Sequence, residues 1–250
     1  MCMANAKYAA AWLRNKKRKK MTITTLYWII FIAIAIASWA VSWSVEAKYK
    51  KYAKQSLPLT GKEVAQKMLH DNGIFDVQIT CIKGQLTDHY NPATKTVNLS
   101  EGVYRGANVA AAAVAAHECG HALQHAQAYT PLKLRSALVP VVSFSSNWVT
   151  WIILAGLLLL GTHPGYVLLL VGIGLYAMLT LFSLITLPVE VNASQRAVSW
   201  LEESGITDRE TTQMASDALH SAAYTYVVAA LSSLATLMYY ILLAFGDRRN

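Results

Sequence analysis

The sequence predicts an α-helical integral membrane protein with four transmembrane helices and a small α+β region. Of its 250 residues, 54% are hydrophobic and only 14% are charged, a balance more apolar than that of an average soluble domain. Four stretches of 20 to 24 residues carry no charged side chain, and each is long enough to cross about 30 Å of hydrocarbon as a helix. Between the first two stretches lies a polar segment in which strand-like alternation precedes an alanine-rich helix pattern.

The first 20 residues form a basic tail. Seven lysines and arginines and no acidic residue occur there, a run that in isolation resembles a nucleic-acid-binding patch. Because the tail directly precedes an apolar stretch, we interpret it as a juxtamembrane anchor at a lipid surface and expect no nucleic-acid partner. Translation from Met21 would remove this tail.

Residues 21–45 form the first expected transmembrane helix. This segment is uncharged from Thr22 to Val45, and its tryptophans lie toward its ends, where membrane interfaces favour aromatic rings. A cleaved signal peptide is the alternative interpretation. The apolar part is longer than a signal peptide requires, however, and no clear small-x-small cleavage site precedes Glu46.

Residues 46–137 form the expected α+β region. After a basic stem, Thr60 and Glu63 have the spacing of a capping box and predict a short helix that ends near Asn72-Gly73. Alternating apolar and polar residues then predict three strands, at 75–82, 85–90 and 95–99. Because short turns join them, we expect a β-meander that leads into a helix over residues 107–128.

That helix carries His117, Glu118 and His121 in an H-E-x-x-H arrangement. Residues four apart lie on one helix face, so the two histidines can direct two imidazole nitrogens at one metal ion. Neutral imidazole suits Zn²⁺, which acidifies a bound water, and the carboxylate of Glu118 can then act as general base. His125 lies about 12 Å further along the helix than His117 and is too distant for the same ion. The alternative is an alanine-rich helix with a polar face and no metal.

After this helix we expect a loop at Pro131–Arg135 and a transmembrane hairpin over residues 138–187. Its two spans are 141–160 and 165–187, joined by a tight turn. Pro188 is expected to stop the second span and to begin a new helix, which continues as a polar segment to residue 221. Residues 222–245 form the fourth span, and residues 246–250 form a short tail.

The hairpin makes Glu190, in the new helix, the candidate third metal ligand. Whichever side of the membrane the 46–137 region occupies, two spans return Glu190 to that side. A carboxylate flanked by valines near a membrane surface needs a partner, and two histidines with one glutamate form a known catalytic zinc set. A solvated surface glutamate is the alternative.

Two other patterns are excluded. Gln124 and Gln127 stand where metzincins have a glycine and a third histidine. The three cysteines, Cys2, Cys81 and Cys119, show no C-x-x-C spacing and imply no disulfide framework.

Four motifs in order carry a resemblance to a known family: L-T-D-H-Y-N-P at 86–92, A-A-H-E-C-G-H-A-L-Q-H at 115–125, P-L-K-L-R-S-A at 131–137 and L-P-V-E-V-N-A-S at 187–194. With these motifs the chain, from Gly61 to about residue 230, resembles the YugP-like neutral zinc metallopeptidases of bacterial membranes. More distantly it is similar to the membrane gluzincins of the HtpX and Ste24 type.

The resemblance implies a zincin-like metallopeptidase region with one zinc ion. It implies that His117, His121 and Glu190 bind this ion and that Glu118 is the general base. In the distant gluzincins the ligand helix usually reads E-x-x-A-D, whereas here Ser194 stands in place of the aspartate. The resemblance therefore does not say which group orients the zinc ligands.

Two functions from different classes follow from these residues. The first is a multi-pass membrane metalloendopeptidase of the bacterial plasma membrane, whose peptide or protein substrate lies extended beside the strand that contains Asp88 and His89. The second is a catalytically inactive membrane scaffold with a structural metal. Glu118 favours the enzyme, because a structural zinc site needs no unligated base beside a ligand. Basic residues near span ends divide nine to eight between the two sides, which leaves the side of the active site open, and the oligomeric state is open too.

A hydrogen-bond donor for the developing oxyanion is also expected. We choose His89, because the order of strand and helix places it beside the metal helix; His220 and Tyr226 are the other candidates. His163 lies in the hairpin turn on the opposite side of the membrane and is excluded.

Overall fold

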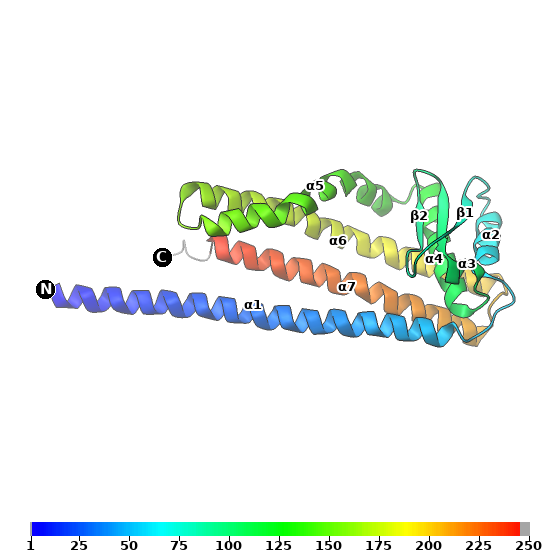
Figure 1. The fold of residues 1–250 in the computed structure, drawn as a ribbon, viewed down its shortest axis with the longest axis horizontal. Coiled ribbons are helices and arrows are strands. Elements are labelled where there is room, and N and C mark those ends of the chain that lie inside the picture. The colour runs from blue at the N-terminus through cyan, green and yellow to red at the C-terminus, as the bar shows by residue number, and fades with distance from the viewer. Residues whose placement is uncertain (1, 246–250) are drawn as a thin grey trace.

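The computed structural model describes residues 2–245, with side chains for Thr25 and for residues 27–245. The elements in chain order are α1 (Cys2–Tyr52), α2 (Gly61–Asp71), β1 (Gln78–Ile82), β2 (His89–Asn91), β3 (Thr96–Ser100), α3 (Glu101–Arg105), α4 (Val109–Ala126), α5 (Thr130–Leu158), α6 (His163–Glu203) and α7 (Arg209–Phe245). The long helices α1, α5, α6 and α7 run along the long axis of the molecule, and the sheet with α2, α3 and α4 lies at one end (Figure 1). The expected C-terminal tail, 246–250, lies outside the described residues, and the expected basic tail lies outside the described side chains.

Within the part of the chain that the structure describes, four helices are long and apolar enough to cross a membrane. They are Tyr27–Tyr52, Thr130–Leu158, His163–Glu203 and Arg209–Phe245. The first is longer than expected, because the basic stem forms its last turns. There Lys48 Nζ and the Tyr52 hydroxyl each donate a hydrogen bond to Asp217 of α7, at 2.7 Å and 2.6 Å, which joins α1 to the rest of the bundle.

Two expected helix boundaries are wrong, and both involve proline. Pro188 lies inside α6, which continues from His163 to Glu203 without a break. A proline removes a single backbone donor, and a long apolar helix in a membrane tolerates that loss. The expected loop at Pro131–Arg135 is instead the start of α5, with Pro131 in the first turn, where its missing N–H would have no intrahelical partner. The chain turns earlier, at Ala128, whose φ is +54°.

The fourth long helix also begins earlier than expected. α7 starts at Arg209 rather than at residue 222, so most of the expected polar segment is helical. Only a short connection separates it from α6, and Asp208 caps α7 by accepting the backbone N–H of Thr211 at 2.8 Å.

The sheet is not the expected meander. Its strand order is β1-β3-β2, with β1 parallel to β3 and β2 antiparallel to β3. β2 and β3 form a hairpin around Asn91, whose side chain accepts the backbone N–H of Ala93 at 3.0 Å. β3 carries the fully buried Val97 and Leu99, so the most buried strand takes the central position, with hydrogen bonds on both sides.

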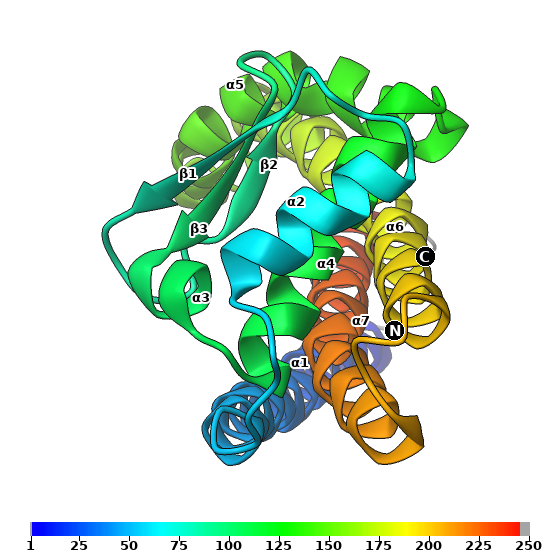
Figure 2. The same cartoon turned by 90° about the vertical axis from the view of Figure 1, so that its right-hand side faces the viewer.

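Helix α4 lies at the centre of this end of the molecule. The capping box of Thr60 and Glu63 begins α2 as expected, and α2 packs its buried Val64, Ala65 and Met68 against α4 in one hydrophobic core. Figure 2 shows α4 between the sheet and α2 on one side and the helices α6 and α7 on the other. The helix with the histidine motif is therefore held by both the α+β region and the long helices.

Candidate metal centre

Asn108 caps the start of helix α4, because its side chain accepts the backbone N–H of Ala111 at 2.9 Å. Its alanine-rich surface allows a close approach to α6. A Cβ on Gly120 would lie only 2.6 Å from the carbonyl oxygen of Ala193, so the two backbones touch at this point. The contact brings the histidine face of α4 against the segment of α6 that contains Glu190.

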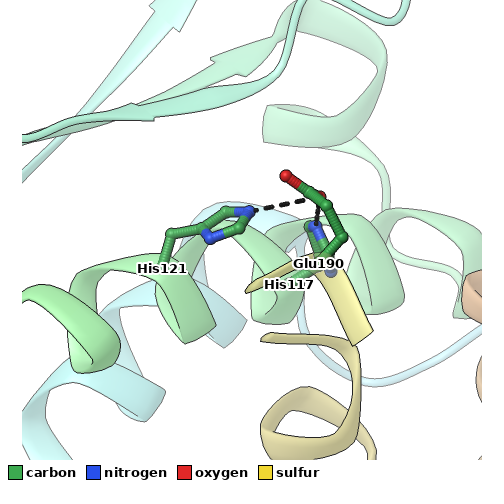
Figure 3. A group of neighbouring side chains, drawn as sticks. All are labelled: His117, His121 and Glu190. Atoms are coloured by element: carbon green, nitrogen blue, oxygen red, sulfur yellow. Dashed lines mark ion pairs between the residues drawn. The ribbon is translucent and has the colours of Figure 1, made fainter. Parts of the chain in front are cut away.

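His117, His121 and Glu190 converge at this contact, two side chains from α4 and one from α6 (Figure 3). The Glu190 Oε2 atom lies 3.3 Å from His117 Nε2 and 3.6 Å from His121 Nε2, and one ligand atom from each residue lies within 4.8 Å of the others. Ligands bound tetrahedrally to zinc at about 2.0–2.1 Å lie about 3.3–3.4 Å from one another. The two distances to Glu190 are close to that spacing, and two imidazoles with one carboxylate are a donor set that would hold a zinc ion.

The other ring nitrogen of each histidine is held by a polar side chain. Ser194 Oγ lies 3.1 Å from His117 Nδ1, so the serine that replaces the aspartate of the distant gluzincins does contact the histidine. Gln124 Oε1 lies 3.0 Å from His121 Nδ1. Partners of this kind orient metal-binding imidazoles and fix their tautomer.

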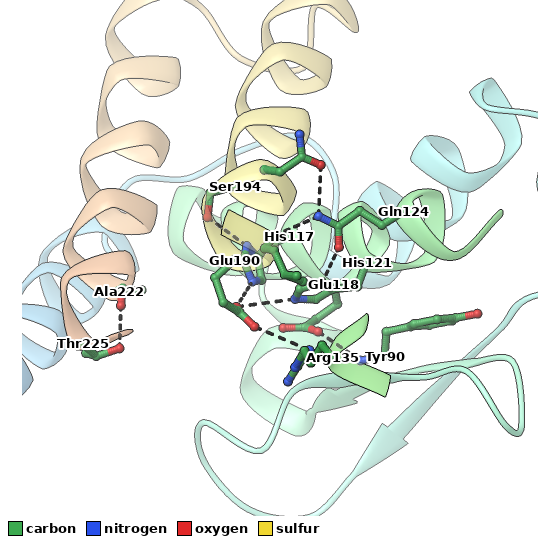
Figure 4. Close-up of polar contacts among 12 residues, drawn as sticks. Tyr90, His117, Glu118, His121, Gln124, Arg135, Glu190, Ser194, Ala222 and Thr225 are labelled. Carbon is green, nitrogen blue, oxygen red and sulfur yellow. Dashed lines mark hydrogen bonds and ion pairs between the residues drawn. The ribbon is translucent and has the colours of Figure 1, made fainter. Parts of the chain in front are cut away.

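Gln124 accounts for a proton on the Nδ1 atom of His121. Its Nε2 donates to the Val189 carbonyl at 2.8 Å and lies 3.0 Å from Asn192 Oδ1, so its Oε1 must be the atom that faces the imidazole. That oxygen can only accept, so the Nδ1 atom of His121 carries a proton, and its Nε2 atom is the one that faces Glu190. Gln124 is fully buried, and Figure 4 shows it linking the histidine to α6.

Charged groups surround the centre. The Arg135 guanidinium of α5 lies 3.7 Å from Glu190 Oε1, and the Tyr226 hydroxyl of α7 faces the same carboxylate. Burial disfavours the charged form of His121, but the carboxylates of Glu190 and Glu118 outweigh it and raise the pKa of its imidazole above the ordinary value. This surplus of negative charge around two imidazoles suits a cation.

Glu118 does not belong to the cluster. It is nearly buried, and its Oε2 accepts the backbone N–H of Tyr90 at 3.0 Å. The Tyr90 hydroxyl lies 2.9 Å from Nδ1 of His125, so β2 is attached to α4 at two points. Glu118 is thus a carboxylate beside the cluster that accepts a hydrogen bond from one backbone amide of β2.

A cavity of about 830 Å³ contains the cluster and Glu118. Strand β2 and the preceding loop form one wall with Asp88, His89 and Tyr90, and α4 forms the floor. The first turns of α5 form the opposite wall, with Leu132, Lys133, Arg135, Ser136 and Val139; α6 adds Phe182 and α7 adds Tyr226.

The remaining candidate histidines fall in three different places. His89 lies on the cavity wall, but its Nδ1 contacts the Thr87 carbonyl at 2.8 Å and its Nε2 contacts the Asn98 amide at 3.2 Å. His220 faces Ser216 in a separate small cavity. His163 begins α6 at its opposite end.

The sequence did not indicate the roles of Gln124 and Arg135 at this site, because those roles depend on contacts with α6.

Comparisons with known proteins agree with this chemistry. The family described as "Putative neutral zinc metallopeptidase" matches residues 27–245. A protein of Bacillus subtilis (strain 168) called "Putative membrane protease YugP" is 39% identical over 226 residues, which cover 88% of this chain and 99% of that protein. No solved structure matches the chain.

Proposed function

This chain belongs to the neutral zinc metallopeptidase family, and we propose that it is a membrane-embedded metalloendopeptidase with one zinc ion. His117, His121 and Glu190 hold the ion, and Glu118 is the general base. The observation that carries the proposal is the arrangement of three ligand atoms within 4.8 Å of one another beside a second carboxylate, that of Glu118, in the same cavity.

The chain's own groups supply the remaining chemistry. Zinc, when bound, supplies a Lewis acid that acidifies water and polarises the peptide carbonyl. The Glu118 carboxylate takes the proton of the attacking water and passes it to the leaving amine. The Tyr90 N–H fixes the position of that carboxylate through one oxygen and leaves the other oxygen free for the proton. Ser194 and Gln124 keep both imidazoles oriented.

Strand β2 is the proposed platform for the substrate. It is an edge strand of the sheet and borders the cavity through His89 and Tyr90. An extended peptide can add to such an edge through main-chain hydrogen bonds. A peptide or protein bound in this way would pass Glu118, because the Tyr90 amide contacts that side chain.

The four apolar helices support a multi-pass protein of the bacterial plasma membrane, in contact with the lipid bilayer. The long helices expose many large apolar side chains, which suits lipid as the surrounding medium. The alternative function is an inactive scaffold with a structural metal. It does not explain why the Glu118 carboxylate lies in the cavity beside the proposed ligands.

The test is metal analysis of the purified protein combined with cleavage of a casein-type substrate. The protein should contain about one zinc per chain, and a chelator should abolish cleavage. The Glu118→Gln variant should keep its zinc and lose at least about a thousandfold in turnover, since the ligands remain while the base is removed. Cleavage by this variant within a few-fold of the wild-type rate would contradict the proposed mechanism.

A further inference from the structure

The cavity around the candidate metal centre lies at the level where the long helices lose their charges. In α5, Arg135 is the last charged residue before the helix ends, and it contacts Glu190. In α6, no charged residue lies between the start of the helix and Glu190. The centre therefore sits at the boundary between the charged and the uncharged parts of both helices.

The charges of helix α7 indicate the same position of the centre along the molecule. Its last charged residue in the described range is Asp217, and Tyr226, which faces Glu190, lies nine residues further on, about 14 Å along the helix. On the polar side of the centre, the next charged residue of α6 is Arg196, about 9 Å beyond Glu190. Glu190 thus lies at the inner edge of this boundary, next to the uncharged stretches of α6 and α7.

The cavity extends from the centre toward the apolar side. Phe182 precedes Glu190 by eight residues of α6, about 12 Å, and Val139 lies one turn past Arg135 on α5; both line the cavity. The wall on the other side is polar and comes from β2 and its loop. One cavity therefore joins an apolar compartment between the long helices to a polar edge strand.

The α5 wall is thinly packed. From Thr130 to Phe144 no residue is buried, and the first buried side chain of α5 is Ser145. Lys133, on the same wall, is exposed at the level where anionic lipid headgroups attract basic side chains. Among the described residues, this half of α5 contributes no buried side chain to the wall of the cavity.

We infer that the substrate is a membrane-anchored polypeptide, cleaved next to its membrane-spanning segment. This inference rests on the proposed peptidase function. The residues on the membrane side of the scissile bond occupy the compartment of Val139 and Phe182, and those on the other side extend along β2. A soluble peptide must insert a chain to this depth, whereas an anchored polypeptide already holds its juxtamembrane residues there.

The test uses the full chain reconstituted with zinc in lipid vesicles and three substrates that contain the same cleavable segment. In the first, the segment directly adjoins a transmembrane helix; in the second, a long flexible glycine-serine linker separates it from the same helix; the third is the free peptide. The first and second are enriched at the membrane alike, so their comparison isolates depth from local concentration.

We expect the first substrate to be cleaved at least about tenfold more efficiently, in kcat/KM, than either of the others. Equal cleavage of the first two substrates would overturn the inference. Zinc-dependent and Glu118-dependent cleavage of the free peptide at the same rate would overturn it too, while leaving the peptidase function intact. Cleavage of none of the three would contradict the peptidase function itself.

Matched variants on α6 provide a second test. Phe182 lines the cavity, whereas Leu184, two residues away, is exposed on the outer surface and lies outside it. Phe182→Ala should lower cleavage of the first substrate by about tenfold or more through loss of an apolar contact, with zinc content unchanged. Leu184→Ala should cleave it like the wild type. Equal rates in the two variants would refute the apolar compartment as a substrate site.

Discussion

Replacing Gln124 by methionine should weaken zinc binding without emptying the space that the side chain fills. Methionine has a similar volume but can neither accept the proton of His121 Nδ1 nor donate to the Val189 carbonyl. Both partners are within 3.0 Å of the glutamine amide, and the glutamine is fully buried. The substitution therefore leaves the buried N–H of His121 without its acceptor and removes the second hydrogen bond to the Val189 carbonyl.

The size of the effect follows from those two groups. A buried polar group without a partner costs about 1–3 kcal/mol, and loss of a residue that orients a metal-binding imidazole lowers metal affinity by about 10- to 100-fold. A 10- to 100-fold loss corresponds to about 1.4–2.8 kcal/mol, so the two estimates agree. The lost contact to His121 weakens the zinc site, whereas the lost contact to Val189 weakens the docking of α4 on α6.

Zinc affinity is measured by competition with a chromogenic chelator, and thermal stability is measured on the metal-free protein. Gln127→Met is the matched control, because Gln127 ends the same helix, is exposed and contacts Arg196 rather than a histidine. Zinc affinity of Gln124→Met within twofold of the control would refute the orienting role of Gln124. A loss of thermal stability alone would assign Gln124 to packing only.

Three further predictions concern the same site. Glu190→Ala should lower zinc occupancy at least about tenfold, whereas His125→Ala should leave it unchanged, because His125 contacts Tyr90 outside the cluster; metal content decides between them. His89→Ala and Tyr226→Phe test which side chain donates a hydrogen bond to the oxyanion. The variant that lacks the donor should keep its zinc but lose about 10²- to 10³-fold in kcat. Full activity of His89→Ala would exclude His89 as the donor. Gly120→Ala should lower stability by about 1–3 kcal/mol, because its Cβ would lie 2.6 Å from an α6 carbonyl oxygen; Gly174→Ala, which meets nothing within 4 Å, is the control in a thermal unfolding assay.

Local sequence signals predicted the local structure. The capping box at Thr60 and the alanine-rich helix around His117 depend on residues three or four apart, and both elements form as expected. The four apolar stretches likewise coincide with the long apolar helices. The prediction that Glu190 returns to the side of the histidines needed only the count of spans between them.

The errors arose where distant contacts decide. Pro188 has the same sequence signature inside a helix and at the start of one, and only the packing of α6 against its neighbours keeps the helix continuous. The strand order depends on which strand has the most buried side chains, and the alternation of each strand alone does not rank them. Gln124 was read only against another zincin pattern, since its partners Val189 and Asn192 lie more than sixty residues away.

The division of the ligands between two helices has a further consequence. His117 and His121 belong to α4 of the α+β region, whereas Glu190 belongs to one of the long apolar helices. The site is therefore complete only when the α+β region is docked on the bundle, and the close approach at Gly120 and the bridge through Gln124 are the contacts that hold it there. Because zinc binds this docked state in preference to an undocked one, the ion adds its binding free energy to the association of the two parts. A soluble fragment that ends before α5 would retain Glu118 and both histidines but lack Glu190, so an active site of this composition requires the membrane helices.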